Sequence, residues 1–171
     1  MPAPVLERLR ADHAAALLRF ELLNRSWFAA SIPDRGDAYF TRFEERHAAL
    51  LAEQEAGLCH FHVLVEDGRV VGRVNLVDVA DGGAELGYRI AEEAAGRGLA
   101  TAAVREVCAR AADVYGLTEL RAATTEDNRA SLTVLTRTGF TPTGPVVLGG
   151  RAGIAFVRAL DAAATPPTAP A

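Results

Sequence analysis

The segment from residue 84 to residue 124 constrains the fold most, because its pattern predicts a strand, a helix and a second strand in direct succession. Residues 84–90 have the composition of a strand, and residues 98–115 place Val104, Val107 and Ala111 on one helical face. Residues 117–124 predict the second strand. Two strands joined through a helix lie parallel in the same sheet. We therefore expect a βαβ unit with one parallel pair of strands.

The flanking segments predict antiparallel strands and further helices. Polar turns at residues 66–69 and 81–83 separate strands of a meander. The expected strands are residues 5–9, 59–66, 70–79, 84–90, 117–124, 146–148 and 154–160. The expected helices are residues 12–25, 37–57, 98–115 and 128–139, with Asp12, Asp37 and Asp127 or Asn128 as caps. The prediction is an α/β fold with a mixed, mostly antiparallel sheet of about seven strands, flanked by about four helices.

The composition excludes several classes of protein. The chain has 171 residues, of which 50% are hydrophobic and 23% charged, and this suits one globular domain. It has no long apolar run, no signal-peptide pattern and only two cysteines. A net charge of −4 argues against general nucleic-acid binding. We expect a cytoplasmic protein with one domain at residues 1–160, a disordered tail at residues 161–171, and no membrane, nucleic-acid or metal partner.

The connection between the central strand and its helix has the chemistry of a phosphate site. The helix opens through Gly96-Arg97-Gly98-Leu99-Ala100-Thr101. The first N–H groups of a helix have no partner within it, and together with the helix dipole they favour an anion. Gly96 and Gly98 let the backbone approach a ligand closely, because they carry no Cβ. The dinucleotide fingerprint needs Gly or Ala where Thr101 stands, and a chain without lysine has no Walker A motif.

Two blocks of residues resemble the GNAT superfamily of N-acetyltransferases. The first is Arg97-Gly98-x-Ala100-Thr101-x-Ala103, and the second is Thr125-x-Asp127-Asn128-x-x-Ser131-x-x-Val134-Leu135-x-x-x-Gly139-Phe140. The Asn-x-x-Ser pattern, with Glu85-Leu86-Gly87-Tyr88 upstream, is similar to the RimJ/RimL branch, the ribosomal-protein N-terminal acetyltransferases and their relatives. The resemblance implies the acyl-CoA N-acyltransferase fold, in which the parallel pair of strands splays apart.

The resemblance also implies a site for acetyl-coenzyme A (acetyl-CoA) between the splayed strands, here residues 85–90 and 120–124. It assigns the pantetheine to backbone groups of Tyr88, Arg89 and Ile90. It assigns the pyrophosphate to the loop Gly96, Arg97, Gly98, Leu99, Ala100 and Thr101, where Arg97 adds charge. It places Asn128 and Ser131 at the thioester end.

The implied reaction is direct attack of an amine on the thioester. Glu85 is the candidate base that accepts the proton of the amine through a water. Ser131 is the candidate donor to the departing thiolate, because Leu135 stands where many superfamily members carry a tyrosine acid. In this branch the N-terminal helices roof the acceptor groove. Candidate contacts of the acceptor are Glu21, Asn24 and Phe28, with Arg25, Trp27 and residues 31–37 nearby, and Glu21 or Asp37 is expected to pair with a cationic acceptor.

Several functions remain open on the sequence. The favoured function is acetyl transfer to a protein or peptide N-terminal α-amine, whose pKa near 8 makes it easier to deprotonate than a lysine side chain. The alternatives are a small amine or antibiotic as the acceptor, a catalytically silent acyl-CoA-binding module and, last, a nucleotide-binding protein. A monomer and a homodimer are both compatible with the sequence.

Four further side chains are expected to be structural. Cys108 and His47 fall on apolar helix faces, where a buried position is expected. His60 and His62 share one strand face without a third metal ligand nearby, so a surface or acceptor-groove position is expected for them.

Overall fold

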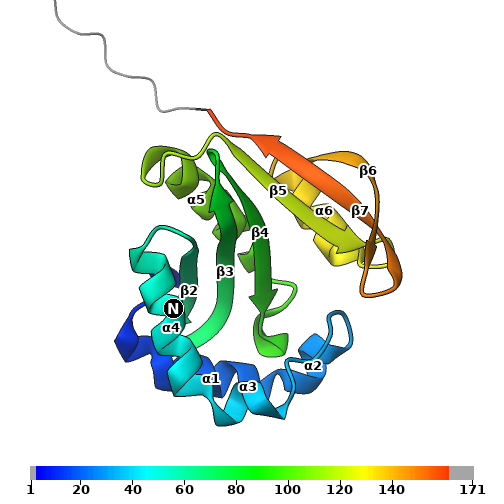
Figure 1. Cartoon of the computed structure of the whole chain (residues 1–171). Helices are drawn as coiled ribbons and strands as arrows, with labels where there is room; N and C mark the ends of the chain where they lie inside the picture. The colour runs from blue at the N-terminus through cyan, green and yellow to red at the C-terminus, as the bar shows by residue number, and fades with distance from the viewer. Residues whose placement is uncertain (1–2, 162–171) are drawn as a thin grey trace, which may run out of the picture.

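A seven-stranded sheet forms the centre of the computed structural model, which describes residues 3–161 (Figure 1). The strand order is β1-β2-β3-β4-β5-β7-β6, and β4 and β5 are the one parallel pair among the described strands. The strands are β1 (Val5–Arg8), β2 (His60–Glu66), β3 (Arg69–Ala80), β4 (Gly83–Ile90), β5 (Glu119–Thr125), β6 (Thr141–Leu148) and β7 (Arg151–Ala159). The predicted βαβ unit and mixed sheet are confirmed, whereas residues 162–171 of the predicted tail lie outside the described residues.

The described part of the chain contains six α-helices in place of the four predicted. They are α1 (Ala14–Leu23), α2 (Arg25–Ala29), α3 (Asp37–Thr41), α4 (Phe43–Glu55), α5 (Leu99–Asp113) and α6 (Arg129–Arg137), and short 3-10 turns cover Ala11–His13 and Glu92–Ala94. The first predicted helix ends at Asn24, close to its expected end, and the short helix α2 that follows was not predicted. The second predicted helix is interrupted at Arg42, and at both residues the backbone leaves helical geometry. At Asn24 the side-chain amide donates to the Phe20 carbonyl, which ends α1 by local competition.

Two of the predicted helix caps are wrong and one is confirmed. Asp12 lies inside the 3-10 turn and accepts from Arg10 Nε instead of capping a helix. Asp37 is the first residue of α3, and Gly36 is its cap. Asn128 caps α6, because its Oδ1 accepts from the backbone N–H of Ser131 at 3.1 Å.

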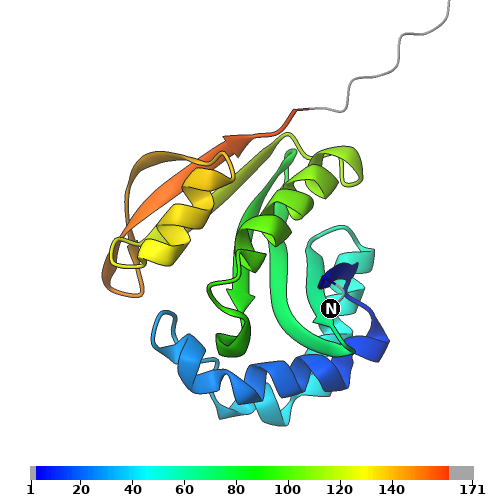
Figure 2. The ribbon, with the colours of Figure 1, turned by 180° about the vertical axis from the view of Figure 1, so that it is seen from behind.

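The two faces of the sheet carry different helices, as the two opposite views show (Figures 1 and 2). Helices α5 and α6 cover one face, and α1 packs on the other against β3. Side chains alternate along β4, so Leu86 and Tyr88 face α5 and α6 while Glu85, Gly87 and Arg89 face the side of α1. The sheet therefore separates two chemically distinct compartments.

The parallel pair of strands splays apart after a short contact. Strands β4 and β5 pair only at Gly83↔Glu119, Ala84↔Leu120 and Glu85↔Arg121. Beyond Glu85, β4 stays with β3 and β5 stays with β7, and the two halves of the sheet diverge (Figure 1). Beyond Glu85, therefore, one edge of β4 has no strand partner among residues 3–161.

The expected surface position of His60 and His62 is wrong, because both side chains are buried. His62 Nε2 lies 2.6 Å from the Tyr115 hydroxyl and His62 Nδ1 lies 3.2 Å from the Val74 carbonyl oxygen. His60 stacks on the same Tyr115 ring at 3.7 Å. Helix α5 and the residues after it thus cover this pair. His47 and Cys108 are buried as predicted.

None of the described helices combines the length and the apolar character that crossing a bilayer requires.

Candidate functional site

The loop before α5 has the backbone conformation of an anion cradle. Gly96 and Gly98 have φ angles of 76° and 75°, which L side chains rarely adopt. Gly98 is the N-cap of α5 and no side chain caps this helix. A Cβ at either glycine would meet no protein atom within 4 Å, so the space beside the loop is open. The uncapped first-turn N–H groups are suited to hold a pyrophosphate there.

Arg97, between these glycines, already has a partner. Its guanidinium forms a two-pronged ion pair with Glu66, with N···O distances of 2.6 and 3.1 Å. This contact lowers the pKa of the Glu66 carboxyl. The pair fastens the loop to the turn between β2 and β3, so Arg97 positions the cradle.

Tyr88 and Ser131 meet across the splay. The Tyr88 hydroxyl donates to Ser131 Oγ at 3.2 Å, and burial raises the pKa of Tyr88, which keeps this donor protonated. The Ser131 backbone is held by Asn128 through the α6 cap. Because Ser131 Oγ accepts from Tyr88, its own proton is free to be donated elsewhere. The structure thus brings three predicted site residues together.

Glu85 lies on the opposite face of β4, where its side chain is exposed. It borders a hollow of about 370 Å³ that is also lined by Glu119, Arg121, Thr143 and Val157. Because β4 and β5 separate directly after Glu85, this carboxylate stands at the start of the splay. A group held in the splay is therefore approached by Glu85 from one face and by Ser131 from the other.

This arrangement agrees with a family match over most of the chain. The acetyltransferase (GNAT) domain family matches residues 5–141. The chain belongs to the GNAT family. It is therefore an N-acetyltransferase, as the sequence predicted.

Solved structures show the same fold at low sequence identity. The ribosomal-protein-S5-alanine acetyltransferase from Vibrio fischeri has a TM-score of 0.88 and 20% identity, over 94% of this chain and 95% of that chain. RimL, a ribosomal L7/L12 alpha-N-protein acetyltransferase in complex with coenzyme A, has a TM-score of 0.84 and 18% identity, over 95% and 97%. Mycobacterium smegmatis RimJ in complex with CoA-disulfide has a TM-score of 0.81 and 24% identity, over 90% and 80%. A comparison with curated proteins gives no match.

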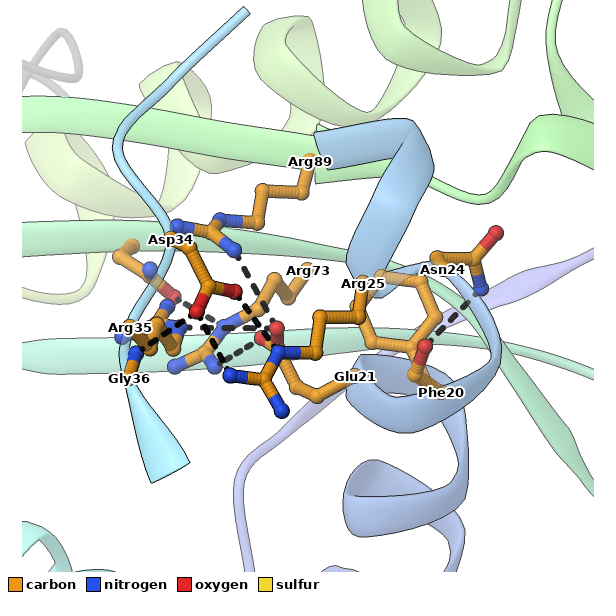
Figure 3. Close-up of polar contacts among 10 residues, drawn as sticks. Phe20, Glu21, Asn24, Arg25, Asp34, Arg35, Gly36, Arg73 and Arg89 are labelled. Atoms are coloured by element: carbon orange, nitrogen blue, oxygen red, sulfur yellow. Dashed lines mark hydrogen bonds and ion pairs between the residues drawn. The ribbon is translucent and has the colours of Figure 1, made fainter. Parts of the chain in front are cut away.

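On the α1 side of this GNAT domain, Glu21 is the centre of a buried ion cluster (Figure 3). Arg73 Nη1 donates to Glu21 Oε1 at 2.8 Å, and Arg89 Nη1 donates to Oε2 at 3.2 Å. Arg35 Nε lies 3.5 Å from the same Oε2. The carboxylate is 1% exposed and has cations on both oxygens. The expectation that Glu21 pairs with a cationic acceptor is therefore wrong, because three arginines already neutralise it.

The other predicted acceptor residues hold the GNAT domain's N-terminal helices against the end of β4. Asn24 Oδ1 accepts from the Glu92 backbone N–H at 3.0 Å, and Trp27 Nε1 donates to the Ile90 carbonyl at 3.2 Å. Phe28 is buried, and the Arg89 guanidinium lies 5.0 Å from its ring centroid. The polar atoms of Asn24 are thus used within the protein, and acceptor contacts by Asn24 and Phe28 stay predictions.

Asp37, the other carboxylate expected to pair with a cationic acceptor, has an internal partner. Arg25 Nη2 donates to Asp37 Oδ1 at 2.8 Å and to Asp34 Oδ2 at 2.7 Å.

Sequence reasoning missed Arg73, and it included Arg35 only as part of the candidate loop at residues 31–37. Arg73 sits in an otherwise apolar part of β3 and is 4% exposed, so an arginine inside a buried strand was the available signal. Arg35 stands in a loop between two short helices and carries no comparable signal.

Proposed function

We propose that this GNAT enzyme transfers an acetyl group from acetyl-CoA to a protein or peptide N-terminal α-amine. The observation that carries the proposal is the splay of β4 from β5 beside the open glycine loop. An unpaired strand edge accepts an extended amide chain as an added strand, which suits the pantetheine at Tyr88, Arg89 and Ile90. The N–H groups of residues 96–101 suit the pyrophosphate. The similarity to RimL, solved with coenzyme A, supports this placement.

The roles of Glu85 and Ser131 follow from their opposite faces. When bound, acetyl-CoA supplies an acetyl thioester that an amine attacks directly. Glu85 accepts the proton of the amine, through a water, on the face of α1. Ser131 donates a hydrogen bond to the departing thiolate on the face of α6, and Tyr88 orients this hydroxyl.

The surroundings of Glu85 favour a peptide as the acceptor over a polycation. The hollow beside Glu85 contains Arg121 as well as Glu119, and its other lining includes Ala123, Thr143 and Val157. A closed acidic pocket, which would suit a polyamine or an aminoglycoside, differs from this open and mixed surface. The proteins solved as S5-alanine and L7/L12 acetyltransferases act on ribosomal proteins by their names, which supports the same acceptor class here. A cytoplasmic location stays a prediction.

Binding and transfer are tested in that order. Calorimetric titration with acetyl-CoA, with NADH and ATP as controls, should show binding of the acyl cofactor alone. Release of the free coenzyme A thiol then measures transfer to peptides with free N-termini, and small amines and antibiotics follow as a second panel. Failure of the folded protein to bind acetyl-CoA would overturn the proposal, and turnover with small amines only would replace the acceptor class.

Two variants test the assigned roles. We expect Glu85→Gln and Ser131→Ala to lower kcat about 100-fold or more while the affinity for acetyl-CoA stays unchanged. Glu55→Gln, at the exposed end of α4, is the matched control and should leave both quantities unchanged. Unchanged turnover in Glu85→Gln and Ser131→Ala would remove these residues from the reaction.

A further inference from the structure

The cluster around Glu21 carries an excess of positive charge. Three guanidinium groups, of Arg35, Arg73 and Arg89, lie against the single carboxylate of Glu21 (Figure 3). Next to the cluster, Asp34 and Asp37 share Arg25, so four guanidinium groups face three carboxylates and one positive charge is in excess. Burial and the nearby arginines lower the pKa of Arg89 to about 10.

The arrangement in the sheet makes this excess costly for the protein alone. Arg73 and Arg89 are directly opposite each other on β3 and β4. Like charges at opposite positions of neighbouring strands repel. Glu21 bridges the two guanidinium groups, yet its two oxygens cannot neutralise Arg35 as well. A second anion would complete the charge balance.

Arg35 has only a weak contact with this cluster. Its Nε is buried and lies 3.5 Å from Glu21 Oε2, but no hydrogen bond joins the two atoms. Arg35 and Arg89 border one hollow of about 10 Å³, which is also lined by Glu21, Asp34, Phe28 and Phe40. The hollow has room for about one water, so a ligand meets both guanidinium groups at its mouth. Planar guanidinium groups match a carboxylate with paired hydrogen bonds.

The hollow lies in line with the proposed reaction centre. Glu85, Gly87 and Arg89 share one face of β4. Glu85 and Arg89 are four residues apart in the strand, which corresponds to about 13 Å. Gly87, between them, leaves open space along this face of β4, because a Cβ there would meet no atom within 4 Å. An extended peptide whose amine lies at Glu85 therefore brings its fourth or fifth side chain to Arg89.

The loop that carries Arg35 borders the outer side of this open space along β4. Residues 31–36 connect α2 to α3. A Cβ at Gly149, in the turn between β6 and β7, would lie 3.8 Å from Pro33 Cγ. The loop therefore reaches from the N-terminal helices to the far half of the sheet.

We propose that Arg35 and Arg89 bind a carboxylate of the acceptor, so that the enzyme prefers peptides with Asp or Glu at the fourth or fifth residue, counted from the residue that carries the acetylated amine. Glu21, which Arg73 holds by an ion pair, positions the Arg89 guanidinium for this contact. The inference rests on the proposed peptide acceptor and adds its specificity.

Twin peptides that differ by one charge test the preference. Each pair carries Asp or Asn, or Glu or Gln, at the fourth or fifth residue and is otherwise identical. With the unmodified enzyme we expect kcat/KM to be about tenfold or more higher for the acidic twin, mainly through KM. Arg35→Gln should abolish this difference and leave the neutral twin unchanged. Arg35 is a loop residue with a side chain that is 28% exposed, so the variant is expected to fold.

Arg42→Gln is the matched control for charge. Arg42 is exposed and pairs with Glu45, outside the cluster, so neither twin should change in this variant. Equal kcat/KM for the two twins in the unmodified enzyme would overturn the proposal. An Arg35→Gln variant that loses activity equally on both twins would overturn it too.

A binding experiment separates this inference from the proposed function. N-terminally acetylated twins cannot react, and Trp27, the single tryptophan of the chain, reports their binding by fluorescence beside Phe28. Tighter binding of the acidic twin without any peptide acetylation would support the anion site while the proposed function fails. Acetylation of both twins at the same rate with equal binding would support the function while the anion site fails.

Discussion

Replacing Glu21 by Gln removes the one carboxylate that separates Arg73 from Arg89. Glu21 is 1% exposed and Arg73 is 4% exposed, so water cannot screen the remaining charges. Loss of one member of a buried ion pair costs about 3–5 kcal/mol, and because Gln keeps the volume and one acceptor oxygen, we expect about 3 kcal/mol. For a chain of this length, that corresponds to a melting temperature lower by about 6–12 °C.

Thermal and urea unfolding followed by circular dichroism measure this loss. Glu45→Gln is the control of the same chemical type, because Glu45 pairs with Arg42 at 2.8 Å but is 67% exposed. An exposed pair contributes at most about 1 kcal/mol, so the control should unfold near the temperature of the unmodified protein. If Glu21→Gln lost no more stability than Glu45→Gln, the reasoning about an uncompensated cluster would be refuted.

Three further predictions concern pH, the cradle and the thiols. Burial lowers the pKa of His62 to about 4 from 6.5, so the unfolded chain binds a proton that the folded protein excludes; the free energy of unfolding should fall between pH 6.5 and about 4, and His62→Gln should flatten that fall in urea titrations. Gly98→Ala forces a Cβ onto a residue with φ of 75°, so calorimetry should show weaker acetyl-CoA binding, and unchanged affinity would contradict the cradle. Burial raises the pKa of Cys59 to about 11 and also raises that of Cys108, so a thiol reagent at pH 8 should label neither before unfolding.

Local patterns account for the features that were predicted well. The positions of the strands and of α5 follow from hydrophobic period and from glycines that end or open an element. The Asn128 cap was recognised because its partner, Ser131, is three residues away. The interruption at Arg42 was missed, because helical spacing of apolar residues continues across it, and the short helix α2 after Asn24 was not expected.

The candidate site was predicted in part for the same reason. The cradle at residues 96–101 is one continuous segment, so the residue types within it are enough to predict an anion-binding loop. Glu85 and Ser131 were placed through the resemblance to a known family, and the structure adds that they stand on opposite faces of the sheet. The surface position expected for His60 and His62 failed, because nothing near them in the chain shows that Tyr115 covers them.

The sequence by itself determined the elements, the parallel pair and the glycine loop, since each depends on residues that are neighbours in the chain. Only the tertiary structure decided how far β4 and β5 pair and which charges meet. Glu21 contacts Arg73 and Arg89 over separations of 52 and 68 residues, and Tyr88 contacts Ser131 over 43. Contacts of that range depend on how the helices and the two halves of the sheet pack, and no local period of the sequence encodes that packing.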